Sequence, residues 1–150
     1  MIEKVEESEQ WTDFELPVEQ FYNEHADEKM KARNYAYDPC YLNRDRSKPE
    51  EDFEDFLNSN TSEILWWWKN GENKIEYFGV KYEYEGQIFT FYPDYLVQLK
   101  DGRLGIFETK DAGDRDGKTY TKVKAESLQK YFAGTKNKKL FGGIAIKKGS

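Results

Sequence analysis

Two carboxylates and a lysine interrupt apolar stretches of this chain. Asp94 lies within Phe91-Tyr92-Pro93-Asp94-Tyr95, and Glu108 and Lys110 lie within Ile106-Phe107-Glu108-Thr109-Lys110. Burying an unpaired carboxylate costs several kcal/mol or forces the group to bind a proton. A hard divalent cation removes that cost, because carboxylate and carbonyl oxygens are the ligands that Mg²⁺ prefers. These residue types therefore predict a site where a metal ion and a lysine act together.

Strand register decides whether the three side chains can meet. Side chains alternate along a strand, so Glu108 and Lys110 share one face. A two-residue turn between the strands would place Asp94 opposite Thr109 and would turn Glu108 to the other face. A shared face needs a three-residue loop, with Asp94 opposite Lys110, or a bulge near Pro93, which has no N–H for the ladder. We therefore predict a register break here, and a regular two-residue hairpin would contradict the metal site.

The elements that must position these residues are helices and strands in a mixed order. Ser47-Lys48-Pro49-Glu50 is a capping box that begins a helix, which Asn58-Ser59-Asn60 ends. A second, amphipathic helix is predicted around Lys122 to Phe132. Turn signals, the strongest of them at residues 100–103, separate predicted strands over residues 64–68, 75–84, 88–99, 104–110 and 142–146. This order predicts an α/β fold with a mixed sheet between helices.

Composition suits one small domain and excludes several classes of protein. The 150 residues fit a single core, and 4 Trp, 11 Tyr and 10 Phe supply much of its apolar surface. One cysteine, Cys40, and one histidine, His25, exclude an internal disulfide, a cysteine-rich zinc site and a Ser-His-Asp hydrolase. The sequence has no bilayer-spanning apolar run and no signal peptide, so we expect a cytoplasmic protein with no membrane partner.

Charge is distributed unevenly along the chain. The formal net charge is −6, yet residues 1–28 hold ten acids and one lysine, whereas residues 100–150 hold 13 bases and six acids. We expect residues 1–46 to form an acidic, aromatic-containing arm with short helices, and residues 47–150 to form the folded domain. The basic third suits an anionic partner such as a nucleic-acid backbone, although a solvated surface also carries such runs of charge.

The motif Pro93-Asp94 followed by Glu108-Thr109-Lys110 resembles that of the PD-(D/E)xK nucleases. A longer series, over roughly residues 45–146, is similar to the C-terminal nuclease domain of the Res subunits of type III restriction enzymes, which are helicase–nucleases. The segments follow one another in the same order, which makes the likeness more specific than the short motif. They are Ser47-Lys48-Pro49-Glu50, Phe53, Phe56-Leu57, Trp66-Trp67-Trp68-Lys69-Asn70-Gly71, Phe78-Gly79-Val80, Tyr82-Glu83, Phe91-Tyr92-Pro93-Asp94-Tyr95-Leu96-Val97, Lys100-Asp101-Gly102-Arg103, Glu108-Thr109-Lys110, Lys124-Ala125-Glu126, Leu128-Gln129-Lys130-Tyr131 and Gly142-Gly143-Ile144.

The resemblance implies a restriction-endonuclease-like core and a metal-dependent DNA endonuclease that hydrolyses phosphodiester bonds by attack of water. Asp94 and Glu108 would bind Mg²⁺, for which Mn²⁺ can substitute, together with the main-chain carbonyl of Thr109. Lys110 would orient the water and stabilise charge on the phosphate. Glu50 matches an acidic residue that often supports such sites. Further candidates for contact with double-stranded DNA are Lys118, Lys122, Lys124, Gln129 and Tyr131.

The expected partners follow from the same resemblance. The sequence has no glycine-rich GxxxxGK[ST] loop, so we expect no ATP site in this chain and place any helicase motor outside it. A motor domain and a modification subunit of a larger restriction complex are therefore the expected protein partners. The alternative is a nuclease-fold module that binds DNA or a partner subunit without cutting, and a further one is a scaffold that never touches DNA.

Each candidate also has a purely structural explanation. The charged trio can form a salt-bridge cluster, and the capping box accounts for Glu50 without a metal. Gln129 and Tyr131 can serve the helix surface and packing. The run Trp66-Trp67-Trp68 can offer a base-stacking platform, but strand core and a domain interface are the favoured explanations. Adjacent rings point to opposite sides, so both faces of the sheet must be covered.

Overall fold

The computed structural model describes Leu16, Glu19, Gln20 and residues 22–70, 78–110, 119–134 and 139–147. These ranges hold two helices, α2 (Lys48–Asn58) and α3 (Thr119–Gly134). Their strands are β1 (Asp27–Met30), β2 (Cys40–Asn43), β3 (Ile64–Lys69), β4 (Val80–Tyr84), β5 (Gln87–Phe91), β6 (Tyr95–Leu99), β7 (Leu104–Lys110) and β8 (Leu140–Ile146). Neither helix is long and apolar enough to cross a bilayer.

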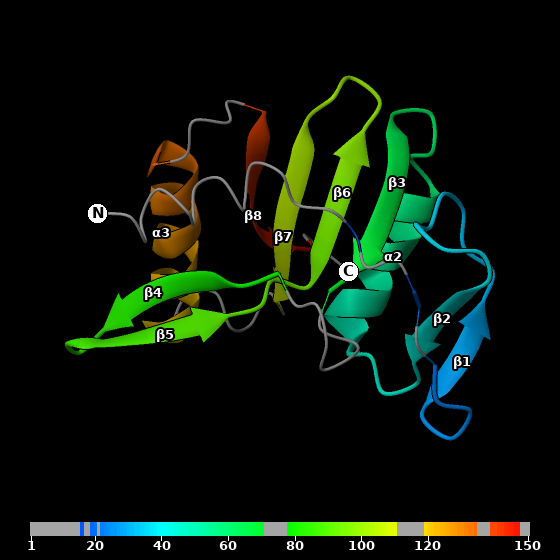
Figure 1. Ribbon diagram of the computed structural model, residues 1–150, viewed down its shortest axis with the longest axis horizontal. Helices are drawn as coiled ribbons and strands as arrows, with labels where there is room; N and C mark the ends of the chain where they lie inside the picture. The colour runs from blue at the N-terminus through cyan, green and yellow to red at the C-terminus, as the bar shows by residue number, and fades with distance from the viewer. Residues whose placement is uncertain are drawn as a thin grey trace.

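A four-stranded mixed sheet forms the centre of the fold, as the order of elements predicts. Its strands lie in the order β3-β6-β7-β8, and α2 and α3 lie beside it (Figure 1). The β3–β6 and β6–β7 pairs are antiparallel, whereas β7 and β8 are parallel. The parallel pair is possible because α3 provides the long crossover that returns the chain to the same end of the sheet.

Two apolar clusters cover the two faces of this sheet. Trp67 packs with Leu57 of α2, whereas its neighbour Trp68 packs with Leu128 of α3. Adjacent strand residues point to opposite faces, so α2 and α3 lie on opposite sides. Trp67 and Trp68 are 1% and 8% exposed, so these two rings are core residues and are not available to stack on bases. The prediction that both faces are covered is confirmed.

The long strand predicted over residues 88–99 is wrong, because the chain forms two strands there. β5 ends at Phe91 and β6 begins at Tyr95, with Pro93 between them. Proline cannot donate a ladder hydrogen bond, which favours the interruption. β5 instead pairs with β4 in a separate antiparallel hairpin that extends away from the central sheet (Figure 1).

Residues 22–46 of the expected arm hold strands and no helix, so the short helices expected within residues 1–46 stay a prediction. This segment forms the two-stranded sheet β1–β2, and residues 1–15 of the expected arm lie outside the described residues. Tyr35 packs its ring edge-on against Trp67 at 4.6 Å, and the Ala36 N–H donates to the Trp67 carbonyl at 2.8 Å. The described part of the arm therefore packs on the core through a ring, as expected.

Close approach of β8 to β7 depends on a glycine. Gly142 lies opposite Ile106 and has a φ of +141°. A Cβ atom at this position would lie 1.9 Å from the Ile106 carbonyl oxygen. Only glycine fits there without moving one of the two strands, and β7 is the strand that carries Glu108 and Lys110.

Replacing this glycine should destabilise the whole sheet. We expect Gly142→Ala to lower the free energy of unfolding by about 3 kcal/mol or more, because it adds a clash with main chain and backbone strain. Urea denaturation followed by circular dichroism measures the loss. The matched control is Gly134→Ala at the end of α3, where a Cβ meets nothing within 4 Å and stability should stay level or rise slightly. Equal stability of the two variants would contradict the close β7–β8 packing.

Candidate active site

The β6–β7 hairpin brings Asp94 and Glu108 to the same face. Tyr95 pairs with Phe107, and one further step in this register places Asp94 opposite Glu108. The loop has three residues, closed by the Leu99 N–H donating to the Arg103 carbonyl at 2.8 Å. The two-residue hairpin that would contradict a metal site is therefore not formed.

The predicted pairing of Asp94 with Lys110 and the predicted register break are both wrong. Asp94 does not face Lys110, and the β6–β7 pairs show no register shift. The reason is that the Lys100 N–H donates to the Glu63 carbonyl at 2.9 Å, so Lys100 belongs to the loop and Leu99 ends the pairing. Moving the loop closure by one residue shifts the register by two, which preserves the face.

Asn70 fixes the main chain around Asp94. This amide is 3% exposed, and its side chain donates to the carbonyls of Phe78 and Pro93 at 2.7 and 2.8 Å. Its main-chain N–H donates to the Asp94 carbonyl at 2.7 Å. The end of β3 therefore positions the segment that links β5 to β6, and sequence reasoning did not assign this role to Asn70. The signal available was a polar residue directly after an apolar strand.

Thr109, which follows Glu108 on β7, orients the Asp94 carboxylate. Asp94 Oδ2 accepts hydrogen bonds from Thr109 N at 2.9 Å and from Thr109 Oγ1 at 2.7 Å. This leaves Oδ1 without a hydrogen bond from the described residues. Asp94 is thus held by one oxygen and keeps the other available for a ligand.

Glu108 is a buried carboxylate that the protein satisfies only in part. Its side chain is 8% exposed, and its Oε2 accepts a charged hydrogen bond from Lys124 Nζ at 3.1 Å. Its Oε1 is buried and has no hydrogen-bond partner among the described residues. Burial, followed by the charge of Asp94, raises the pKa of the Glu108 carboxyl from 4.5 to about 7, against the opposing charges of Lys124 and Lys110.

The lack of a described partner for Glu108 Oε1 shows whether a metal ion would suit this position. A buried acceptor without a donor is costly, and a hard cation shared with a neighbouring carboxylate removes that cost. Glu108 and Asp94 together therefore fit Mg²⁺ or Mn²⁺ as ligands. Among the described residues, however, no three His, Cys, Asp or Glu side chains gather closely enough to form a metal group. The fit rests on two carboxylates, and the Thr109 carbonyl remains a predicted third ligand.

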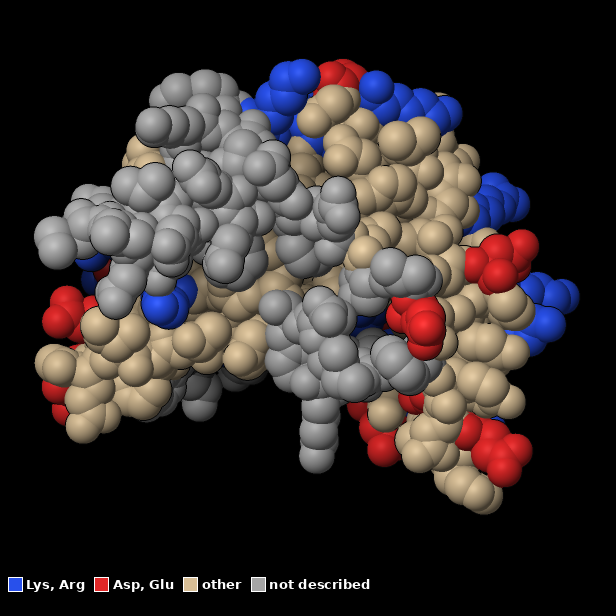
Figure 2. Space-filling view, viewed as in Figure 1, with Lys and Arg blue, Asp and Glu red and all other residues tan. Residues whose placement is uncertain are grey.

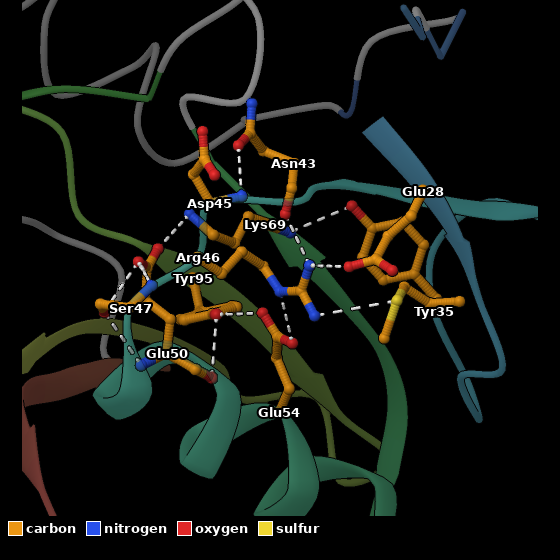
Figure 3. Close-up of polar contacts among 11 residues, drawn as sticks. Glu28, Tyr35, Asn43, Asp45, Arg46, Ser47, Glu50, Glu54, Lys69 and Tyr95 are labelled. Atoms are coloured by element: carbon orange, nitrogen blue, oxygen red, sulfur yellow. Dashed lines mark hydrogen bonds and ion pairs between the residues drawn. The ribbon is translucent and has the colours of Figure 1, made fainter. Parts of the chain in front are cut away.

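Glu50 does not join this pair. Its Oε2 lies 2.7 Å from Lys69 Nζ, and its Oε1 accepts hydrogen bonds from Ser47 N and Oγ, each at 2.9 Å (Figure 3). Although burial opposes it, Lys69 and Ser47 hold the pKa of the Glu50 carboxyl below its usual value. The capping box predicted from the sequence is therefore present, and Glu50 as a metal-supporting acid stays a prediction.

Lys69 and Glu50 adjoin a buried polar network on the α2 face, which the Tyr95 hydroxyl links to the Glu50 carbonyl at 3.3 Å. Arg46 donates to Glu54 at 2.9 Å, and the Tyr95 hydroxyl donates to the other Glu54 oxygen at 2.6 Å (Figure 3). The side chains of Arg46 and Glu54 are 3% and 6% exposed. Sequence reasoning missed this network, since these residues come from a loop, a helix and two strands that only the tertiary fold brings together.

The predicted DNA contacts have different surroundings. Lys118 lies outside the described residues. Lys122 is exposed, 4.0 Å from Glu126, and Gln129 is also exposed on α3. Tyr131 is half-buried against Phe78 and Phe132, which favours its packing role. Lys124 is turned towards Glu108, and Lys110 shares the face of Glu108 without an ion pair to a described residue.

Part of the positive charge lies at the far end of the sheet. Figure 2 shows basic side chains along the upper edge, over the β6–β7 loop, where Lys100, Arg103 and Lys139 are exposed. β7 has 7 residues, which at about 3.3 Å each separates this edge from Lys110 by about 20 Å. These three bases therefore cannot contact the same phosphate as the site.

Stability should depend on pH through Glu108. The rise of its pKa from 4.5 to about 7 corresponds to as much as about 3 kcal/mol. The folded state retains a proton that the unfolded state releases, so this stability is present below about pH 4.5 and is lost as the pH rises through about 7. In EDTA, we expect Glu108→Gln to become more stable relative to the wild type between about pH 5 and pH 8. Urea denaturation at each pH measures the difference.

The exposed Glu83→Gln is the control for this prediction. Its difference from the wild type should stay constant over the same range, because the side chain lies in solvent on β4. A constant difference for Glu108→Gln as well would show that its carboxyl titrates as an ordinary exposed group.

Comparison with known proteins gives no family for this chain. A scan against known protein families, a search of curated proteins and a search of solved structures each found no match.

Proposed function

We propose that this chain is a metal-dependent DNA endonuclease domain that hydrolyses phosphodiester bonds by attack of water. The observation that carries this proposal is Glu108, a buried carboxylate with one unsatisfied oxygen beside Asp94. A structural ion-pair cluster would satisfy both oxygens, whereas a metal-binding pair needs one free. The resemblance of the sequence to the PD-(D/E)xK motif points to the same residues.

The mixed sheet with a helix on each face also supports the proposal, since this is the coarse architecture that the resemblance implies. We propose that the finer fold is the restriction-endonuclease-like core. A motor domain and a modification subunit are the proposed partners outside this chain. The sheet keeps Asp94, Glu108 and Lys110 on one face at the end of a rigid hairpin, which suits a site that must hold a phosphate in one orientation.

Each residue of the site has a distinct task in this reaction. Bound Mg²⁺ would polarise the phosphate and lower the pKa of water. Glu108 and Asp94 supply negative charge at fixed positions, and Thr109 keeps the Asp94 carboxylate oriented by donating to Oδ2. Lys110 places a positive charge on the same face, where it orients the water and stabilises charge that develops on the phosphate oxygens.

Plasmid cleavage tests the proposal. With Mg²⁺ or Mn²⁺, the wild type should nick or linearise supercoiled DNA. Asp94→Asn, Glu108→Gln and Lys110→Met should each reduce the rate about 100-fold or more. The first two remove a charge that would hold the metal ion, and the third removes the charge that stabilises the phosphate. Gel electrophoresis of time points gives the rates, and EDTA should abolish cleavage.

Two exposed residues outside the site serve as matched controls. Asp45→Asn and Lys29→Met change the same charges on the surface and should cleave at the wild-type rate. Cleavage that survives Asp94→Asn and Lys110→Met would come from a contaminating nuclease and would overturn the assignment.

The second candidate is a non-cleaving module that binds a partner subunit or DNA. The β4–β5 hairpin favours it, because Ile88 is 73% and Phe89 37% exposed on an arm that extends from the sheet, with Tyr92 45% exposed beyond it. Large exposed apolar side chains close together are typical of interaction surfaces. DNA binding at full strength by the wild type and all site variants, without cleavage by any of them, would select this candidate.

A further inference from the structure

We propose that Lys124 is an internal counter-ion of Glu108 that a divalent cation displaces when it binds. This inference rests on the proposed function, because it takes Asp94 and Glu108 as the metal-binding pair. It assigns to Lys124 a role in the metal-free protein that differs from the phosphate contact expected from its position on α3.

The Lys124–Glu108 pair differs from an ordinary surface ion pair. The two side chains are 21% and 8% exposed, and 3.1 Å separates Lys124 Nζ from Glu108 Oε2. On the same helix, Lys122 and Glu126 are 81% and 58% exposed and lie 4.0 Å apart. Solvent screens a partly buried pair much less, so the Lys124 contact is the stronger of the two.

Lys124 reaches the sheet from the opposite layer. Its Nζ also lies 5.5 Å from the centre of the Phe91 ring, at the end of β5. Lys110, although it shares the strand and face of Glu108, forms no ion pair with a described residue. The ammonium in direct contact with Glu108 therefore comes from α3, and Lys110 lies on the same strand face as a second positive charge.

A divalent cation and Lys124 compete for the same carboxylate. A cation held by Glu108 and Asp94 would lie within a few ångströms of the Lys124 ammonium, and like charges repel strongly where water is largely excluded. Glu108 Oε1 is buried but has no hydrogen-bond partner in the part of the chain that the structure describes, so it can bind the cation without losing a contact, whereas Lys124 occupies Oε2. The lysine stem is flexible, so Lys124 can leave Glu108 for the exposed α3 surface beside Lys122.

Calorimetric titration of the full chain with MnCl₂, repeated with MgCl₂, tests this competition. Lys124→Met removes the competitor, so it should bind Mn²⁺ about tenfold more tightly than the wild type, or about 1.4 kcal/mol. Lys124→Arg retains the charge and should stay close to the wild type. The matched control is Lys122→Met, which removes an exposed charge from the same helix and should change the affinity little.

A second measurement does not depend on the heat of binding. In EDTA, Lys124→Met should melt at a lower temperature than the wild type, because Glu108 loses its counter-ion. Saturating Mn²⁺ should then raise its melting temperature by more than it raises that of the wild type. If Lys124→Met does not fold, Lys124→Gln, which keeps a hydrogen-bond donor without the charge, takes its place in both measurements.

The outcomes separate this inference from the proposed function. Mn²⁺ binding by the wild type, with unchanged or weaker binding by Lys124→Met, would overturn the counter-ion role and leave the metal site in place. Absence of binding by the wild type and by every variant would overturn the metal site and this inference together. Tighter binding by Lys124→Met alone, with Lys124→Arg and Lys122→Met near the wild type, supports it.

Discussion

The burial of the Glu108 carboxylate constrains both the stability and the chemistry of this protein. Glu108 lies in the central strand β7, where its neighbours Ile106 and Thr109 are buried. A charge at such a position reduces folding stability unless something compensates for it. The compensation is incomplete, because Lys124 binds one oxygen while the other has no partner among the described residues. Functional sites commonly retain such costs, since groups that bind a ligand must not be fully satisfied without it.

Several features of the fold serve to hold that carboxylate in place. Gly142 allows β8 to lie close against β7, and Asn70 ties the end of β3 to the chain around Asp94. Thr109 then orients the Asp94 side chain next to Glu108. These residues contact main chain or one another, so their contribution is positional. The charges that act on a ligand remain few, namely Asp94, Glu108, Lys110 and, until a cation arrives, Lys124.

The two faces of the sheet carry different polar chemistry. On the α2 face, Arg46, Glu54 and Tyr95 form a network in which the charged groups are paired. On the α3 face, the pairing of Glu108 is partial. A paired network of this kind fixes the packing of a core, whereas an incomplete one is suited to binding. Glu50 belongs by its contacts to the first kind, because Lys69 and Ser47 engage its carboxylate.

Local signals determined much of the architecture from the sequence. The capping box at Ser47 begins α2, the apolar runs form β3 and β7, and the three tryptophans require a covered sheet, because these features depend on neighbours within a few residues. Sequence reasoning failed in two places along the strands. One failure was local, because Pro93 divides a predicted strand in two. The other was the β1–β2 sheet over residues 27–43, which depends on pairing between separate segments.

The sequence by itself therefore determined which residues could carry chemistry: two acids and a lysine at positions where apolar side chains are expected. Only the tertiary structure decided how they meet. The Lys100 N–H bonds to Glu63, which closes the hairpin one residue earlier than predicted and brings Asp94 opposite Glu108. The packing of α3 on the sheet decided that Lys124 is the lysine in contact with Glu108. Both outcomes depend on contacts between segments far apart in the chain, which residue spacing does not encode.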